Sequence, residues 1–308
     1  MTTAGDEGPS AQVGVGVIGL GNIGGAVAAN LLADGHAVTV HDADPARVAV
    51  LTAAGAHGAD DAAGVAAAAD VTLASLPTPD VVERVVDAWL PAARPDAVFV
   101  DLSTNAPAMV RRLGERVAAA GRHFLEAPLT GGAPGAQGRM LVFMVGGDAA
   151  VYERCRPLLA RLGRASFHVG VLGLGNVAKL VNSLLAFQAA WGSLEVLAVA
   201  SKAGIDLRTM VEVIRTGGAG NFFTERMVEG INDRGRPTQF ALALAAKDAG
   251  LFVALAQELA VPVPTSASVA QVLVEAVGEG LGDRDFTDLV ELVERRAAHG
   301  LHLAPPRR

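Results

Sequence analysis

Cysteine is nearly absent from this sequence, and aromatic residues are scarce. One of the 308 residues is cysteine, Cys155, and aromatic types make up 4% of the chain. A disulfide framework within the chain is therefore excluded, and we expect a reducing, cytoplasmic compartment. One cysteine and seven histidines scattered along the chain do not supply the ligands of a catalytic zinc site, so we expect no metal.

A net positive charge is also missing. The formal net charge is −7 and the sequence pI is about 5.5, and no run of lysine and arginine reverses this locally. An acidic chain of this kind carries no electrostatic footprint for nucleic acid or for an anionic membrane. We therefore expect neither of them as a partner.

Long uncharged apolar runs are lacking too. The most apolar segment, residues 180–200, is interrupted by Asn182, Gln188 and Glu195, so we expect a buried helix there and no membrane span. Residues 1–12 contain two acidic residues and no apolar run. That segment is expected to be a short disordered tail and not a signal peptide.

The first half of the chain alternates strand-like and helical patterns. Hydrophobic types make up 51% of the 308 residues, and this length predicts two domains. Alternation of this kind predicts an α/β fold with a parallel sheet that is covered by helices on both faces. We expect strands at residues 13–19, 37–41, 71–76, 98–102, 123–127 and 140–145, and helices ending at Ala33 and covering residues 81–90 and 107–120.

A glycine-rich turn follows the first expected strand. It has the spacing GxGxxG, in which the first glycine permits the tight turn, the second lets a pyrophosphate approach and the third allows close packing of helix on strand. The helix that follows presents its N-terminus to the anion. These features predict a dinucleotide site made by Gly19, Leu20, Gly21, Asn22, Ile23 and Gly24.

The choice of dinucleotide is predicted by the end of the second expected strand. Asp42 comes there, where a carboxylate bonds the ribose hydroxyls of NAD and repels the 2′-phosphate of NADP. We therefore expect NAD, although Arg47 is close enough in sequence to leave NADP possible. Leu76 and Pro77, at the end of the next strand, are also assigned to cofactor binding.

The second half of the chain shows helical patterns with scarcely any strand signal. We expect a Rossmann-type parallel sheet domain over residues 13–165 and an all-α domain over residues 166–308, joined by a long helix. The expected helices cover residues 177–203, 207–215, 222–230, 242–260, 266–278 and 286–298.

Several segments, in the same order, resemble the 3-hydroxyisobutyrate dehydrogenase (β-hydroxyacid dehydrogenase) family. They span residues 13 to about 260. Two departures stand out: the family more often has Asp-Ala-Pro-Val-Ser-Gly-Gly at residues 126–132, and Asn where this chain has Ser183. The matching segments are the turn at 19–24, Asp101-Leu102-Ser103-Thr104, Glu126-Ala127-Pro128-Leu129-Thr130-Gly131-Gly132, the Gly170, Gly173, Gly175, Lys179 and Asn182 group, and Phe240 with Lys247-Asp248.

The resemblance implies roles for these residues. Lys179 and Asn182 match the catalytic segment, and Thr104 and Lys247 match cofactor contacts. Thr130 stands where the family has a serine that binds the substrate carboxylate. We assign Ser103, Thr130, Gly131 and Gly132 to the substrate. The resemblance further implies a homodimer or homotetramer built through the helical domain.

Lysine chemistry also follows from the residues themselves. An ammonium donates to a carbonyl oxygen and stabilises the alkoxide that develops on it, and a buried lysine exchanges protons readily. Asn182 lies one helical turn after Lys179, on the same face. A Tyr-x-x-x-Lys pair is absent, because Arg156 stands four residues after the only tyrosine, Tyr152.

The leading hypothesis is NAD(P)-linked oxidation of a small, anionic 3-hydroxy acid to its semialdehyde. Two alternatives use the same fold: a reductase of glyoxylate or another semialdehyde, and an imine reductase, against which Lys179 argues. A third alternative is a protein that binds NAD and does no chemistry.

Overall fold

The computed structural model describes residues 14–303, and the chain divides into two compact units between Lys179 and Leu180. The disordered tail predicted at residues 1–12 lies outside the described residues. The domain boundary predicted between residues 165 and 166 stays a prediction.

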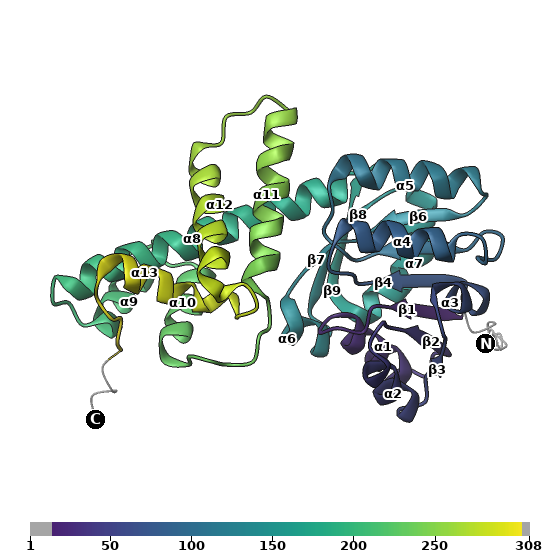
Figure 1. The fold of residues 1–308 in the computed structure, drawn as a ribbon, viewed down its shortest axis with the longest axis horizontal. Coiled ribbons are helices and arrows are strands. Elements are labelled where there is room, and N and C mark those ends of the chain that lie inside the picture. Colours follow the sequence, from purple (N-terminus) through teal and green to yellow (C-terminus); the bar gives the residue numbers. More distant parts are fainter. Residues whose placement is uncertain (1–13, 304–308) are drawn as a thin grey trace, which may run out of the picture. The chain divides into compact units, whose positions relative to one another are not determined.

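A nine-stranded sheet forms the centre of the first unit (Figure 1). Its strand order is β3-β2-β1-β4-β5-β6-β8-β7, with β9 also paired to β8. The strands from β3 to β6 are parallel, as the alternating pattern predicts. The strands are β1 (Val15–Ile18), β2 (Val38–His41), β3 (His57–Gly58), β4 (Val71–Ala74), β5 (Val98–Asp101), β6 (His123–Glu126), β7 (Leu129–Thr130), β8 (Leu141–Gly146) and β9 (Gly163–Gly170).

The far end of the sheet differs from the prediction. Strand β8 pairs antiparallel with both β6 and β7, so the sheet is mixed and not wholly parallel. A short helix over residues 132–137 makes the connection from β7 back to β8. A right-handed crossover to a parallel strand needs a connection of a dozen residues or more, so this short link gives an antiparallel pair.

Helices cover both faces of this sheet. One buried cluster joins the strands to α1, α2 and α7, and a second joins them to α3, α4 and α5. This two-faced burial is what a parallel Rossmann-type sheet requires. The helices are α1 (Gly24–Ala33), α2 (Pro45–Ala53), α3 (Ala62–Ala68), α4 (Pro79–Trp89), α5 (Pro107–Ala119), α6 (Gly132–Gln137) and α7 (Ala149–Leu162).

The second unit is helical, as predicted. Among residues 180–303 the only β-pairing is an isolated bridge between Ala241 and Asp285. One apolar core contains side chains from each of its α-helices. The elements are α8 (Leu174–Lys202), which begins in the first unit, α9 (Leu207–Thr216), α10 (Phe222–Asn232), α11 (Leu242–Glu258), α12 (Pro264–Ala276), η1 (Val277–Leu281), η2 (Phe286–Asp288) and α13 (Leu289–Ala297).

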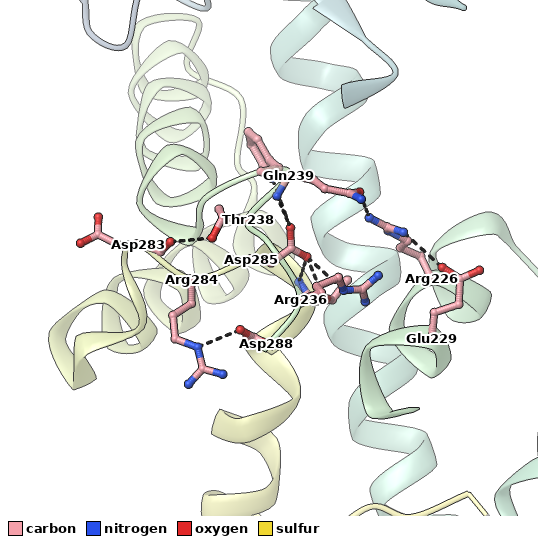
Figure 2. Close-up of polar contacts among 11 residues, drawn as sticks. Arg226, Glu229, Arg236, Thr238, Gln239, Asp283, Arg284, Asp285 and Asp288 are labelled. Carbon is pink, nitrogen blue, oxygen red and sulfur yellow. Dashed lines mark hydrogen bonds and ion pairs between the residues drawn. The ribbon is translucent and has the colours of Figure 1, made fainter. Parts of the chain in front are cut away.

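The carboxylate of Asp285 joins two loops of this helical unit (Figure 2). It accepts the backbone N–H groups of Gln239 at 2.8 Å and Phe240 at 3.2 Å. It also accepts the hydroxyl of Thr287 at 2.6 Å, and the guanidinium of Arg236 lies 3.8 Å away. The segment before α11 is thereby held against the start of η2.

Helix α8 is the one helix of the described residues that is long and apolar enough to cross a membrane. Of its most apolar 18-residue window, 61% is buried inside the protein. The core helix of a globular protein passes the same test of length and composition, and the buried share fits that interpretation.

Candidate functional site

The carboxyl ends of five parallel strands lie in register at one edge of the sheet. Ile18 pairs with both His41 and Ala74, Ala74 pairs with Asp101, and Asp101 pairs with Glu126. The residues that follow these strands therefore meet at one edge, where open α/β sheets bind their ligands. Most of the residues predicted to bind the cofactor come directly after these ends.

The glycine-rich turn after β1 has the geometry that its spacing predicts. Gly19 has a φ of +83°, a left-handed conformation that favours glycine. A methyl group on Gly19 would overlap the carbonyl oxygen of Ser75, and one on Gly24 would overlap that of Gly19. Gly21 has no such neighbour, because the nearest atom to an added methyl is Arg47 Nη1 at 4.0 Å. A phosphate can therefore approach the backbone at Gly21.

Asp42 holds this turn from the end of β2. Its carboxylate accepts the N–H of Leu20 at 2.6 Å and that of Asp44 at 2.8 Å, and Arg47 Nη1 lies 3.6 Å away. Burial alone would raise the pKa of Asp42, but the two N–H donors and Arg47 outweigh burial and leave the pKa lowered. Asp42 is therefore a fixed negative charge next to the predicted dinucleotide turn.

Arg47 gives this corner of the site a second charge. Its guanidinium lies 3.5 Å from Asp44 as well as near Asp42, and about half of its side chain is exposed. The two carboxylates hold the cation, so a 2′-phosphate would have to compete with them for it.

The loops after β4 and β5 are joined to each other. The hydroxyl of Ser103 accepts the N–H of Leu76 at 2.9 Å, and the Ser103 side chain is almost fully buried. Ser103 therefore supports the loop that contains Leu76 and Pro77, in addition to the substrate contact predicted for it. Thr104 follows and is partly exposed at the same edge.

A buried polar chain, which sequence reasoning missed, continues from β5. Asp101 accepts the N–H of Ser103 at 2.9 Å and the amide of Asn105 at 2.7 Å. The N–H of Asn105 in turn donates to the side-chain oxygen of Asn176 at 2.7 Å. Burial raises the pKa of the Asp101 carboxyl to about 7, so this group is partly protonated near neutral pH.

Glu126, at the end of β6, completes this chain and caps the start of α8. Its carboxylate accepts the N–H groups of Gly173, Gly175 and Asn176, and the Asn176 amide as well. Burial raises the pKa of Glu126, although these four donors oppose that effect. Lys179 lies five residues after the first residue of α8, Leu174, and is half-buried.

The segment predicted to bind the substrate carboxylate lies on β7 and the start of α6. Thr130 ends β7 and pairs with Val142 of β8. Gly131 and Gly132 have φ values of +122° and +61°, which favour glycine at both positions. This backbone turn presents its N–H groups at the start of a helix, the kind of place where carboxylates bind without a neighbouring cation.

Two of the predicted site residues belong to the second unit. Asn182 lies on α8, three residues after Lys179, and is exposed. Lys247 lies on α11, where its ammonium is 3.1 Å from the nearly buried carboxylate of Asp248. The catalytic role of Asn182 and the cofactor contact of Lys247 stay predictions.

The chemistry available at the first unit's strand ends is that of a dinucleotide-dependent enzyme. A turn open to a phosphate, a fixed carboxylate at the position predicted to bind the ribose and a lysine on a capped helix are present. Within residues 14–303 no group of three or more histidine, cysteine or acidic side chains could hold a metal ion. The site residues thus fit NAD(P) as the cofactor.

Two family models match the chain and together span most of it. The model described as the NAD binding domain of 6-phosphogluconate dehydrogenase matches residues 14–171. The model described as "NAD-binding of NADP-dependent 3-hydroxyisobutyrate dehydrogenase" matches residues 173–293.

Named relatives and a solved structure extend over nearly the whole chain. The 3-hydroxyisobutyrate dehydrogenase of Pseudomonas aeruginosa is 36% identical over 89% of this chain and 96% of its own length. The 2-(hydroxymethyl)glutarate dehydrogenase of Eubacterium barkeri is 33% identical over 92% of this chain and 96% of its own length. The structure of Mycobacterium tuberculosis 3-hydroxyisobutyrate dehydrogenase with L-serine has a TM-score of 0.84 at 30% identity, over 92% of this chain and 99% of that one.

Proposed function

The chain belongs to the 3-hydroxyisobutyrate dehydrogenase family, and we propose that its own substrate is a small 3-hydroxy acid, oxidised reversibly to a semialdehyde. Like its relatives, it is an NAD(P)-dependent oxidoreductase that acts on CH–OH groups. The M. tuberculosis relative was solved with L-serine, which is itself a 3-hydroxy acid, and this supports the substrate class.

Lys179 is the residue to which we assign proton transfer. In oxidation its neutral amine accepts the proton of the substrate hydroxyl, and in reduction its ammonium donates a proton to the carbonyl oxygen. A bound nicotinamide supplies the acceptor for the hydride that leaves the substrate carbon. One observation carries the assignment: Lys179 lies near the start of α8, which Glu126 ties to the strand ends where the dinucleotide turn also lies.

The carboxylate of the substrate is assigned to the turn at Thr130, Gly131 and Gly132. The N–H groups there and the threonine hydroxyl can bind an anion without adding a charge. Ser103 contributes a hydroxyl from the loop after β5, and Asn182 follows Lys179 by three residues on α8. A carboxylate-bearing substrate is expected to bind better than the same alcohol without it.

NAD is the cofactor that we propose for this site. Asp42 is held as a carboxylate by N–H donors, and a 2′-phosphate brought near it would be repelled. Arg47 is already engaged by Asp42 and Asp44, which limits what it can offer to that phosphate.

The proposed function is tested by the absorbance of NADH or NADPH at 340 nm. We expect turnover of a 3-hydroxy carboxylate such as 3-hydroxyisobutyrate, L-serine or 2-(hydroxymethyl)glutarate. The value of kcat/KM with NAD should exceed the value with NADP by about tenfold or more. Each carboxylate is compared with its amide, which keeps the hydroxyl and removes the charge. Equal rates for acid and amide would refute the anion site at residues 130–132. Turnover of imines alone would refute the assigned reaction.

A second copy of the chain is proposed as the partner of α8. Val181, Leu185, Val196 and Val199 form an apolar stripe along the helix, and more than half of each side chain is exposed. Gly192 lies on the same stripe, where an added methyl group would meet nothing within 4 Å. An apolar stripe with a glycine in its middle suits the close approach of another helix, so we propose a homodimer or homotetramer assembled through it.

If α8 forms the interface through this stripe, a charge placed there should lower the molar mass of the protein in solution. Leu185→Glu places a charge in the proposed contact and is expected to shift the protein toward monomer, because an unpaired charge is costly to bury. Val213→Glu is the matched control, since Val213 is also more than half exposed but lies on α9, outside the stripe. The molar mass is measured by light scattering at micromolar concentration. A monomeric wild type, or a Leu185→Glu variant with the mass of the wild type, would contradict the proposed interface.

A cytoplasmic location is proposed together with this function. Cys155 is buried, and burial raises the pKa of its thiol to about 11, so the thiol stays protonated and unreactive. Cys155 therefore fills a core position and is not available for a disulfide with another chain. A single buried thiol of this kind is in line with a reducing compartment.

A further inference from the structure

The buried carboxylate of Glu126 has no reaction of its own in the proposed chemistry. It is fully buried at the end of β6, and four N–H groups from residues 173–176 converge on it. Three of these donors are backbone groups at the N-terminal end of α8, which have no partner within the helix itself. Glu126 therefore replaces the missing helix turn with a negative charge, the charge that a helix N-terminus favours.

The space for this side chain is made by two glycines. A methyl group on Gly146 would overlap Oε1 of Glu126, and one on Gly175 would lie 2.9 Å from its Cγ. Neither position tolerates a larger residue while Glu126 keeps this conformation. The backbone of β8 and the first turn of α8 thus leave room for a glutamate, and its carboxylate reaches all four donors at residues 173–176.

The same contact connects α8 to the loop after β5. Asn176 uses its amide N–H for Glu126 and its amide oxygen for the backbone N–H of Asn105. Asn105 is in turn held by Asp101 at 2.7 Å. All four side chains are buried. One continuous chain of hydrogen bonds therefore runs from the loop that contains Ser103 and Thr104 to the helix that contains Lys179.

We propose that Glu126 is a positioning residue for Lys179: its carboxylate sets the place and direction of the first turn of α8, and Asn176 with Asn105 holds that turn to the loop after β5. This inference rests on the catalytic role proposed for Lys179. The lysine follows Asn176 by three residues, which is less than one helical turn, so a shift of the capped turn displaces the lysine by a similar amount.

The expected effect follows from the sensitivity of catalysis to position. A displacement of about 1 Å costs a reaction roughly 100-fold in rate. Glu126→Gln keeps the size of the side chain, removes the charge and turns one acceptor into a donor that faces N–H groups. We expect it to lower kcat about 10- to 100-fold. The affinity for NADH should stay within about twofold, because the dinucleotide turn and Asp42 do not contact Glu126.

The matched control is Thr72→Val. Thr72 is also fully buried in the same sheet, where its hydroxyl accepts the indole N–H of Trp89 at 2.9 Å. This variant loses one buried hydrogen bond on β4 and leaves α8 alone. We expect a loss of thermal stability, with kcat within about twofold of wild type.

Three readouts separate positioning from general damage: kcat and KM for the 3-hydroxy acid, the dissociation constant of NADH from its fluorescence, and backbone hydrogen exchange of residues 173–179. We expect Glu126→Gln to lower kcat with little change in KM or NADH binding, and to speed hydrogen exchange in residues 173–179. Thr72→Val should do neither. Restoring the carboxylate as Glu126→Asp should recover part of kcat. A Glu126→Gln enzyme with kcat within twofold of wild type, or with losses matched by Thr72→Val, overturns the proposal.

A second variant covers the case in which Glu126→Gln does not fold. Asn176→Ala leaves the charge of Glu126 and its backbone donors in place and removes the bridge to Asn105. It should lower kcat by about tenfold and keep NADH binding, whereas an unchanged kcat would overturn the bridging role. A wild-type protein without turnover would refute the proposed function, and the exchange of residues 173–179 would still decide whether Glu126 fixes the start of α8.

Discussion

Alanine in place of Lys179 is expected to lower kcat for a 3-hydroxy acid by about 1,000-fold, which is within the usual range for a lost general acid–base group. The amine is the group assigned to take the hydroxyl proton, and alanine leaves nothing that can replace it. NADH binding should persist, because the turn at residues 19–24 and Asp42 lie on other elements. The rate is measured at 340 nm, and cofactor binding is measured by NADH fluorescence.

The chain offers a matched control for this experiment, because it contains only three lysines, at positions 179, 202 and 247. Lys202 lies on the same helix, at its other end, where its ammonium donates to the carbonyl of Ala297 at 2.7 Å. Lys202→Ala should leave kcat within about twofold of wild type. If Lys179→Ala kept more than a tenth of the wild-type kcat, lysine would not be the acid–base group.

Removal of the Asp285 carboxylate is expected to destabilise the protein by about 3–5 kcal/mol, the cost of breaking a buried charged pair from one side. Asp285→Ala leaves four donors without their acceptor: the N–H groups of Gln239, Phe240 and Thr287, and the Thr287 hydroxyl (Figure 2). It also leaves the guanidinium of Arg236, which is 8% exposed, without a carboxylate beside it. Guanidinium chloride unfolding, followed by tryptophan fluorescence, measures the loss.

Asp283→Ala is the control for this variant. Asp283 is exposed two residues away, and its backbone carbonyl, which accepts the hydroxyl of Thr238, stays in place. A change within about 0.5 kcal/mol is expected for such a surface position. Equal destabilisation by the two variants would contradict the role assigned to Asp285.

The contribution of Asp285 should depend on pH in a defined direction. Burial raises the pKa of this carboxyl, but the hydrogen bonds from Thr287, Gln239 and Phe240 outweigh burial and leave the pKa lowered. A folded-state pKa below the unfolded value means that the stabilisation is present above pH about 3.9 and is lost as the pH falls through the folded pKa. The difference between wild type and Asp285→Ala should therefore shrink at acid pH.

Much of the fold could be predicted because its signals are local. The strand, glycine turn, helix and strand over residues 15–41 follow from an apolar run, a fixed spacing and a helix stop, and the structure confirms them. The long helix was expected at residues 177–203 and spans Leu174–Lys202. Its buried apolar side chains and its stop at Gly204 are both visible in the sequence.

Other elements gave weaker signals. Helices α2 and α3 are short and rich in alanine, so their apolar periodicity is faint, although Asp44 and Asp61 cap them. Helix α7 holds Pro157 inside it, which argues against a helix when only the sequence is read. The direction of β8 is set by the connection before it and not by the pattern within it, and the sheet was therefore expected to be wholly parallel.

The residues of the candidate site also differ in how well the sequence predicts them. Gly19, Gly24 and Asp42 could be assigned because their spacing is short and each has a physical reason. The sequence gives no sign of the role of Glu126 beyond its place in a matching segment, because its partner Asn176 is 50 residues away and their contact depends on the folded sheet. A buried carboxylate that accepts hydrogen bonds from distant backbone N–H groups has no characteristic spacing by which a single sequence would reveal it.

In the proposed reaction, hydride passes from the hydroxyl-bearing carbon of a 3-hydroxy acid to a nicotinamide, and isotope transfer follows this step directly. The enzyme is given NAD and 3-hydroxyisobutyrate in which both hydrogens of the hydroxyl-bearing CH2 group are replaced by deuterium, and the NADH formed is examined by mass spectrometry and proton NMR. We expect one deuterium at C4 of the nicotinamide, on one face of the ring only, and about 1,000-fold less labelled NADH when Lys179→Ala replaces the wild type over the same time. NADH without deuterium, or no NADH from this or any other 3-hydroxy carboxylate in spite of cofactor binding, would contradict hydride transfer from a 3-hydroxy acid.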